Sequence, residues 1–348
     1  IDLMKIKLNT IVIHFFLFCC VNVGFTMDKN NQVALMYHDK FLQHNTGSGH
    51  PENANRLIAA IDELKTNSAY KNALVWPSFS PASNAIIGLA HSQSYINLVE
   101  KEISALSEQD LAYLSTGDTV ISKNTLEAAK LAVGAGIKAA DMIVKGEINS
   151  AFALVRPPGH HATQDRGMGF CVFNNVAIVA RYLQQQHNFK RILIVDFDVH
   201  HGNGTQDIFY SDDTVFYFSI HQHPFYPGTG RPNETGAGRG EGYTLNIDLP
   251  AGSDDDDLIQ GLNNQLKPAM DQFKPDFVLV SAGFDAYKGD ILGELNYTSN
   301  GYKEAAITLN NIAKDYSNGH IIYMLEGGYT PENIKNAATS IIDVLINN

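Results

Sequence analysis

The sequence predicts an α/β protein with a mostly parallel β-sheet and helices on both faces. Short apolar runs rich in β-branched residues recur along the chain, as expected for strands that are buried on both sides. Stretches of helical length separate many of these runs, and this alternation is typical of parallel sheets. The 348 residues, 44% of them hydrophobic, exclude disordered, collagen and disulfide-scaffold classes.

The expected elements follow one another without an internal repeat or a low-complexity tract longer than Asp254 to Asp257. A single domain from residue 32 to residue 348 is therefore predicted, although the length would also fit two ordinary domains. The expected strands are Val33 to Tyr37, Ala151 to Val155, Arg191 to Val195, Thr214 to Ile220, Tyr243 to Ile247, Phe277 to Val280 and Ile321 to Leu325. The expected helices are Thr125 to Val144, Val176 to Gln186, Leu258 to Phe273, Tyr302 to Lys314 and Pro331 to Ile346.

Residues 1–26 are expected to lie outside the fold. After Met4, two lysines precede an apolar run from Ile11 to Phe25, and a small-x-small triplet ends at Thr26, which is the layout of a secretory signal peptide. The run is short for a membrane span. In the alternative, translation starts at Met27 and the preceding 26 residues are not part of the protein. The first interpretation implies a secreted or periplasmic protein and the second a cytoplasmic one.

Charge and cysteine content limit the partners. The chain has 25 Lys and Arg against 37 Asp and Glu, a net charge of −12, so no large cationic field exists to bind nucleic acid. An acidic surface suits a basic partner such as a lysine-rich tail or a polyamine. Of three cysteines, only Cys171 lies in the main body, which excludes a disulfide framework there.

Four polar, glycine-rich clusters directly follow expected strands. In a parallel sheet, ligands bind outside the carboxyl ends of the strands. The clusters are therefore expected to converge on one cleft. They are Arg156 to His161, Asp196 to Gly204, Ser281 to Asp285 and Leu325 to Tyr329.

One cluster has the spacing of a metal site. Asp196, Asp198 and His200 alternate with apolar residues, so their side chains point to the same side of an extended segment. A carboxylate and an imidazole two residues apart can reach one ion, and Asp285 is the best candidate for a third ligand. This donor set suits Zn²⁺, and it also accepts Fe²⁺ or Mn²⁺. The alternative is a capped strand end with satisfied polar groups.

Other residues of the clusters suit amide hydrolysis. Near a metal, His160 and His161 can take a proton from attacking water and deliver one to the leaving amine. Tyr329, after the hinge Gly327-Gly328, can donate a hydrogen bond to the developing oxyanion. The alternative for Tyr329 is a core tyrosine.

Longer motifs carry a family resemblance. They are Gly47 to Glu52, Arg156 to Ala162, Gly169 to Asn175, Asp196 to Thr205, Pro227 to Gly230 and Glu326 to Tyr329. With them the chain resembles the histone deacetylase superfamily, zinc-dependent amidohydrolases on the arginase-like α/β fold. The Gly-Asn-Gly-Thr form at residues 202–205 and the Leu-Glu-Gly-Gly-Tyr ending are similar to the class II branch and its bacterial relatives.

The resemblance implies a role for each matching residue. Asp198, His200 and Asp285 would be the zinc ligands. His161 would be the general base that then acts as acid, and His160 its electrostatic partner.

In this family the residue that matches Asp196 orients the first histidine, and the residue at position 203 orients the second. Here position 203 is Asn203, as in class II. His161 would then lack a charged partner and be neutral more easily. Tyr329 takes the transition-state role, which implies a competent deacetylase.

The resemblance also implies a substrate tunnel and a second ion. Phe170 and Tyr226 match two aromatics that line an acyl-lysine tunnel beside Gly169, and the second is usually Phe. Asp118 lies near the rim position that grips the substrate backbone. The remaining implied site, for K⁺ or Na⁺, comprises Asp196, Asp198, His200 and Ser219.

Several further residues are expected to be structural. Cys171 is expected to pack as a small apolar residue. His50 and Glu52 belong to the first loop and need not touch the metal. Arg156, Gly159, Asn174 and His91 are expected supports, and His187, His221 and His223 are expected surface or loop histidines.

Two functions remain in competition. The first is hydrolysis of N-acetyl-lysine in proteins or peptides, including histone-like tails, with release of acetate. The second is hydrolysis of acetylpolyamines or other small amides. Polyamine-selective members are expected to carry an acidic gatekeeper where this chain has Leu292, which favours acyl-lysine, although Glu294 is two residues away. A non-catalytic acyl-lysine reader and a two-metal ureohydrolase are disfavoured, because the motif residues are complete and the additional carboxylates are missing.

Overall fold

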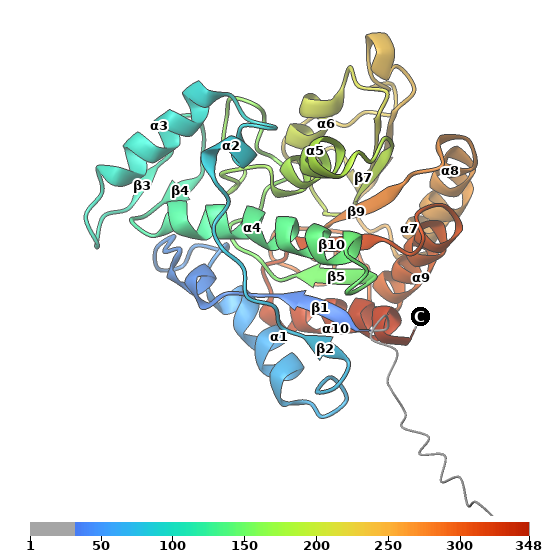
Figure 1. The fold of residues 1–348 in the computed structure, drawn as a ribbon, viewed down its shortest axis with the longest axis horizontal. Helices are drawn as coiled ribbons and strands as arrows, with labels where there is room; N and C mark the ends of the chain where they lie inside the picture. The colour runs from blue at the N-terminus through green and yellow to red at the C-terminus, as the bar shows by residue number, and fades with distance from the viewer. Residues whose placement is uncertain (1–31, 348) are drawn as a thin grey trace, which may run out of the picture.

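The computed structural model describes residues 32–347, so the expected signal peptide at residues 1–26 lies outside the described residues. Its centre is an eight-stranded sheet in the order β2-β1-β5-β10-β9-β6-β7-β8, and every pair of neighbours is parallel (Figure 1). The predicted α/β class with a mostly parallel sheet is confirmed. The final strand, β10, lies in the middle of the sheet between β5 and β9.

All seven expected strands are present; the strand Ile321–Leu325 has the expected bounds, and the other six are shifted by one or two residues at their ends. They are β1 (Val33–Met36), β5 (Ser150–Ala153), β6 (Ile192–Asp196), β7 (Val215–Gln222), β8 (Thr244–Leu249), β9 (Phe277–Ala282) and β10 (Ile321–Leu325). Three further strands were not expected: the two-residue edge strand β2 (Leu74–Val75) and the antiparallel pair β3 (Ala112–Tyr113) and β4 (Val120–Ile121). Strands this short carry too few residues for a periodic signal.

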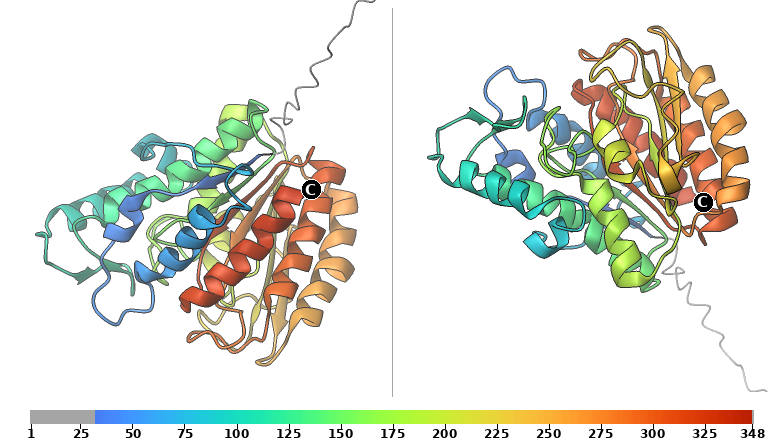
Figure 2. Two further views of the ribbon diagram at one scale, coloured as in Figure 1. Left: turned by 90° about the horizontal axis from the view of Figure 1, so that it is seen from below. Right: turned by 90° about the horizontal axis from the view of Figure 1, so that it is seen from above.

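Helices cover both faces of the sheet (Figure 2). On one side α10 packs against both α1 and α9, and on the other α4 packs against α5. The helices are α1 (Asn55–Thr66), α2 (Asn84–Ile87), α3 (Gln93–Ser104), α4 (Thr125–Val144), α5 (Asn175–His187), α6 (Asn203–Phe209), α7 (Asp255–Gly261), α8 (Lys267–Phe273), α9 (Ser299–Tyr316) and α10 (Pro331–Asn347).

The helix expected at Leu258 to Phe273 needs correction. It begins earlier, because Asp254 and Asp257 form a capping box that starts α7 at Asp255. A π-helical segment, Leu262–Leu266, then separates α7 from α8. The acidic residues Asp254 to Asp257 therefore form the N-cap and first turn of α7.

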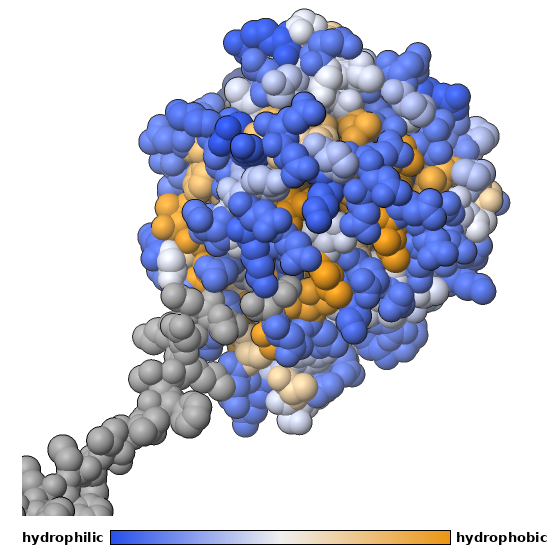
Figure 3. Space-filling model, turned by 90° about the vertical axis from the view of Figure 1, so that its right-hand side faces the viewer, coloured by the Kyte–Doolittle hydropathy of each residue, from blue (hydrophilic) through white to orange (hydrophobic). Residues whose placement is uncertain are grey.

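The surface seen in Figure 3 is largely hydrophilic, with apolar side chains in small separate areas. Among residues 32–347, no helix combines the length and the apolar character needed to cross a bilayer. The strands β5, β10, β9 and β6 are buried along their whole length and are consecutive neighbours in the sheet. Their carboxyl ends therefore bring the four polar clusters to one place.

Candidate active site

Asp198, His200 and Asp285 come together past the ends of β6 and β9. Their candidate ligand atoms all lie within 4.8 Å of one another. His200 Nδ1 is 3.1 Å from Asp198 Oδ1 and 3.2 Å from Asp285 Oδ2. Asp285 Oδ2 is buried and has no partner in hydrogen-bonding geometry among the described residues. A buried carboxylate oxygen rarely stays unpaired, so this oxygen-rich set fits a divalent cation such as zinc.

The other oxygens of the two carboxylates are held by the backbone. Gly327 N donates to Asp198 Oδ2 at 2.8 Å, and Val199 N donates to Asp285 Oδ1 at 3.0 Å. A Cβ at Gly327 would come within 2.0 Å of Asp285 Oδ2 and 2.6 Å of Asp198 Oδ2. Only glycine fits at this position, because the carboxylates occupy the space of a side chain. Such outer contacts orient the ligands.

His160 and His161 lie side by side, with ring centroids 4.0 Å apart, but differ in their partners. His160 Nδ1 is 3.0 Å from Asp196 Oδ2. Burial alone would lower the pKa of His160, but the Asp196 and Asp198 carboxylates raise it to about 10. Asp196 also accepts a hydrogen bond from the Tyr217 hydroxyl at 3.1 Å. The two carboxylates thus favour the protonated form of His160.

His161 has an amide partner, as the sequence predicts. His161 Nδ1 is 2.8 Å from Asn203 Oδ1, so this ring nitrogen carries the proton. Burial and the neighbouring His160 and His200 hold the pKa of His161 well below its usual value. His161 is therefore neutral, and its Nε2 is free to accept a proton.

Glu326 supports this arrangement, a role that sequence reasoning missed. Its carboxylate accepts hydrogen bonds from Gly159 N at 2.6 Å, His160 N at 3.1 Å and Ser281 Oγ at 3.0 Å. Burial raises its pKa to about 7. Its only signal in the sequence is its place inside the motif that ends at Tyr329.

Glu326, His160 and Cys171 also lie close enough to suggest a second metal site. They do not fit one, because both Glu326 oxygens already accept hydrogen bonds. Burial also raises the pKa of Cys171 well above its usual value, so the thiol keeps its proton. Cys171 is fully buried, as expected for a packing residue.

Tyr329 lies on a pinned segment and not on the flexible hinge expected from Gly327-Gly328. The Arg56 guanidinium donates to Gly328 O and Glu326 O, both at 2.5 Å, and lies 5.0 Å from the centre of the Tyr329 ring. Asp290 accepts from Tyr329 N at 2.8 Å. Arg56 comes from α1, which sequence analysis did not foresee because no side chain caps its start.

Arg56 belongs to a buried ionic cluster with Glu52, Arg156 and His44. Arg156 contacts Glu52 through Nε and through Nη2, the latter at 2.7 Å, and Arg56 Nη1 lies 3.0 Å from Glu52 Oε1. Burial alone would raise the pKa of Glu52, but Arg156 and His44 lower it well below its usual value. The cluster connects the first loop to the loop of Tyr329.

A cavity of about 180 Å³, here called the tunnel, leads to these groups. A Cβ at Gly169 would meet the His161 ring at 2.2 Å, so glycine lets this wall approach the histidine. Glu294 is turned to Gln222, which it contacts at 2.7 Å, and does not line the tunnel. The five residues expected to bind substrate all line the tunnel, together with three residues of the proposed catalytic centre. The first five are Asp118, Gly169, Phe170, Tyr226 and Leu292, and the other three are His161, His200 and Tyr329.

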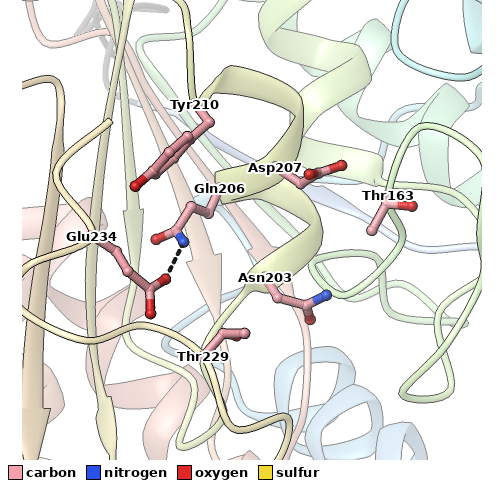
Figure 4. A pocket seen from close by; sticks show the side chains of 7 residues that line it. All are labelled: Thr163, Asn203, Gln206, Asp207, Tyr210, Thr229 and Glu234. Carbon is pink, nitrogen blue, oxygen red and sulfur yellow. Dashed lines mark hydrogen bonds between the residues drawn. The ribbon is translucent and has the colours of Figure 1, made fainter. Parts of the chain in front are cut away.

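A second, polar cavity of about 420 Å³ lies behind Asn203 (Figure 4). On one side Asn203 accepts a hydrogen bond from His161 Nδ1, and on the other side it lines this cavity. Gln206 donates to Glu234 at 2.6 Å across its floor, and His201 contacts Gln206 at 3.1 Å. Asn203, the hydrogen-bond partner of His161, is thus accessible from this second cavity as well. No sequence pattern predicted this cavity.

The remaining predicted residues have mixed outcomes. Ser219 pairs with Asp196 in the sheet, and its hydroxyl lies 2.9 Å from His221 Nδ1. His221 is fully buried, so its expected surface or loop position is wrong. The reason is that β7 extends to Gln222, and His221 Nε2 lies 2.9 Å from Gly230 O. His187, at the end of α5, pairs with Asp141 at 2.9 Å.

Comparisons with known proteins agree with this geometry. A family model described as the histone deacetylase domain matches residues 50–345. The chloroplastic histone deacetylase 10 of Oryza sativa subsp. japonica is 42% identical over 305 residues, 84% of this chain and 68% of that protein. The chloroplastic histone deacetylase 14 of Arabidopsis thaliana is 38% identical over 344 residues, 93% of this chain and 80% of that protein.

A solved structure agrees as well. The crystal structure of the HDA15 HD domain matches with a TM-score of 0.84 and 35% identity, covering 91% of this chain and 90% of that one. The resemblance seen in the motifs is confirmed by sequence and by fold, and this chain belongs to the histone deacetylase family.

Proposed function

We propose that residues 32–348 form a catalytic domain that hydrolyses the amide of N-acetyl-lysine in proteins or peptides and releases acetate. The observation that carries this proposal is the meeting of Asp198, His200 and Asp285 with His161 and Tyr329 around one tunnel. A long apolar stem with a neutral amide suits such a narrow cavity.

The proposed ion is Zn²⁺, one per chain, held by Asp198, His200 and Asp285. When bound, it would polarise the substrate carbonyl and lower the pKa of a water molecule. We also propose K⁺ or Na⁺ near Asp196 and Ser219, which pair in the sheet, together with Asp198 and His200.

The proton transfers are assigned to His161. Its Nδ1 proton is held by Asn203, so Nε2 accepts a proton from the attacking water. The same nitrogen then delivers this proton to the amine as the carbon–nitrogen bond breaks. His160, held by Asp196, stabilises the negative charge that develops beside it.

Tyr329 is assigned to the oxyanion. Burial and the Asp285 carboxylate raise the pKa of its hydroxyl well above the usual value, so it remains a donor. Arg56 and Asp290 hold the segment in place from two sides. The donor is therefore positioned before substrate binds.

The mouth of the tunnel favours a protein or peptide substrate. Leu292 lines it where an acidic gatekeeper would attract a polyamine, and Glu294 is bound to Gln222 instead. Ile291, which precedes Leu292 in the chain, is 65% exposed and gives the mouth of the tunnel an apolar edge. Asp118 is the one rim carboxylate among the lining residues, and it supports acetylpolyamine as the second candidate.

A substrate and metal series tests the proposal. Enzyme stripped with a chelator should be inactive, recover with one Zn²⁺ per chain, and cleave acetyl-lysine peptides faster than acetylspermidine by kcat/KM. Fe²⁺ is added in parallel to decide the metal. A faster rate on acetylspermidine would replace the substrate assignment, and full activity without metal would remove the mechanism.

A further inference from the structure

Asn203 can present either end of its side-chain amide to His161, and the two choices have opposite consequences. In the structure Oδ1 lies 2.8 Å from His161 Nδ1, so the ring carries its proton on Nδ1 and Nε2 is free to accept one. With the amide nitrogen in that place, Nδ1 would become the acceptor and the ring proton would move to Nε2. The general base would then be lost. The orientation of this amide is therefore a condition for the proposed reaction.

The nitrogen end of the amide has one contact that distinguishes the two orientations. Asn203 Nδ2 donates to Met168 Sδ at 3.6 Å, an ordinary hydrogen-bond length for an atom as large as sulfur. A thioether sulfur accepts weakly and has no proton to donate. With the amide reversed, Oδ1 would face the sulfur, and two acceptors would meet without a proton between them. Met168 thus favours the orientation that His161 needs.

No other contact of the amide makes this selection within residues 32–347. The hydrogen bonds of the Asn203 side chain go to His161 and Met168. Asn203 also borders the polar cavity, where Figure 4 shows a hydrogen bond between Gln206 and Glu234 and none to Asn203. Solvent in such a cavity can donate as well as accept, so it fits either orientation.

The position of the sulfur is restricted by the wall of the tunnel. Met168 O accepts a hydrogen bond from Cys171 N at 2.9 Å. The preceding residue, Gly167, donates through N to Thr116 Oγ1 at 3.1 Å and accepts from the same hydroxyl at 2.9 Å. A Cβ at Gly117 would lie 3.0 Å from Met168 Cβ, so this turn packs directly on the methionine. The backbone that carries the sulfur is therefore held from two sides.

We propose that Met168 is a positioning residue for the reaction, whose thioether sulfur keeps the Asn203 amide in the orientation that places the His161 proton on Nδ1. The proposal rests on the proposed function, because it concerns the proton transfers assigned to His161. A carboxylate at position 203 would need no such neighbour, since both of its ends accept hydrogen bonds.

The first test locates the His161 proton and does not depend on activity. Met168→Leu removes the acceptor and nearly keeps the volume of the side chain. In the metal-loaded enzyme with ¹⁵N-labelled histidine, the ring signals of His161 are those that disappear in His161→Ala. Their ¹⁵N shifts should show the proton on Nδ1 in the wild type and partly on Nε2 in Met168→Leu. Identical shifts in the two proteins, or a proton on Nε2 in the wild type, would overturn the proposal.

The second test is kinetic. In Met168→Leu, kcat on an acetyl-lysine peptide should fall about two- to fivefold, because only part of the population keeps the competent ring. KM should stay unchanged, since the place of the ring proton affects the transfer and not the binding of the peptide. Met142→Leu is the matched control, because Met142 lies in α4 and does not line the tunnel.

A double-mutant cycle separates orientation from packing. In an Asn203→Asp background the side chain has no nitrogen end, so Met168→Leu should leave kcat nearly unchanged. An equal fall of kcat in both backgrounds would mean that Met168 acts by packing alone and would overturn the proposal. A wild type that carries the His161 proton on Nδ1 but cleaves no acetylated amide would refute the proposed function and support the assigned orientation.

Discussion

The inner end of the tunnel and its mouth are built in different ways. At the inner end, buried polar groups sit at strand ends and are held by several partners, as Asp198 is by Gly327 N and His200 N. At the mouth, Asp118, Tyr226 and Leu292 stand on connecting segments and are more exposed. Rigid strand ends suit chemistry that tolerates little displacement, whereas loops can change without disturbing the sheet. The comparison suggests that rate and substrate choice are separable in this molecule.

The largest effect is expected at the inner end. His161→Ala removes the imidazole that lines the tunnel beside the proposed ligand His200, whose ring centre is 5.9 Å away. We expect kcat/KM on acetyl-lysine peptides to fall about 10³-fold, roughly 4 kcal/mol, the scale of a lost general acid–base group. Thermal melting checks that the fold persists. Activity within tenfold of the wild type would remove His161 from the proposed mechanism.

The next effect concerns the ionic cluster behind the inner end. Glu52→Gln leaves Arg56 and Arg156 buried without a carboxylate, and breaking such a cluster costs about 3 kcal/mol. Urea unfolding should show this loss. The matched control is Glu332→Gln, which breaks the exposed pair with Lys335 and should cost less than about 0.5 kcal/mol. Equal losses in both variants would contradict the distinction.

The smallest effect is expected at the mouth. Leu292→Glu places a carboxylate in the tunnel wall and should shift kcat/KM toward acetylspermidine, relative to acetyl-lysine peptide, about tenfold, or 1.4 kcal/mol. Ile291→Glu is the control, because Ile291 points to solvent and does not line the tunnel. A comparable shift from Ile291→Glu would mean that overall charge, and not position, decides the preference.

The residues of the inner end could be predicted because each of them directly follows an expected strand. Asp196, Asp198 and His200 follow one strand with the alternation of an extended chain, and strand ends in a parallel sheet must converge. Asp285 could be named for the same reason. The structure brings these groups together as expected, and their catalytic roles stay proposals.

What the sequence could not show depends on distant contacts. Arg56 reaches the carbonyl of Glu326, 270 residues away, and a lone arginine in an uncapped helix gives no sign of such a partner. His221 was expected on the surface or in a loop because the predicted strand ended at Ile220, whereas β7 continues to Gln222. The cavity behind Asn203 depends on residues from three separate loops and helices, so no local pattern marks it.

The place of β10 in the sheet has a consequence for how the protein is made. Of the strands within residues 32–347 it is the last to be synthesised, yet it fills the gap between β5 and β9 and leads directly to Glu326 and Tyr329. A nascent chain that stops before residue 321 has two half-sheets with unpaired inner edges and no complete site. Such long-range pairing is slow to form. The site is therefore complete only after residues 321–329 have been synthesised, and chains that end before residue 321 would be ready substrates for chaperones and proteases.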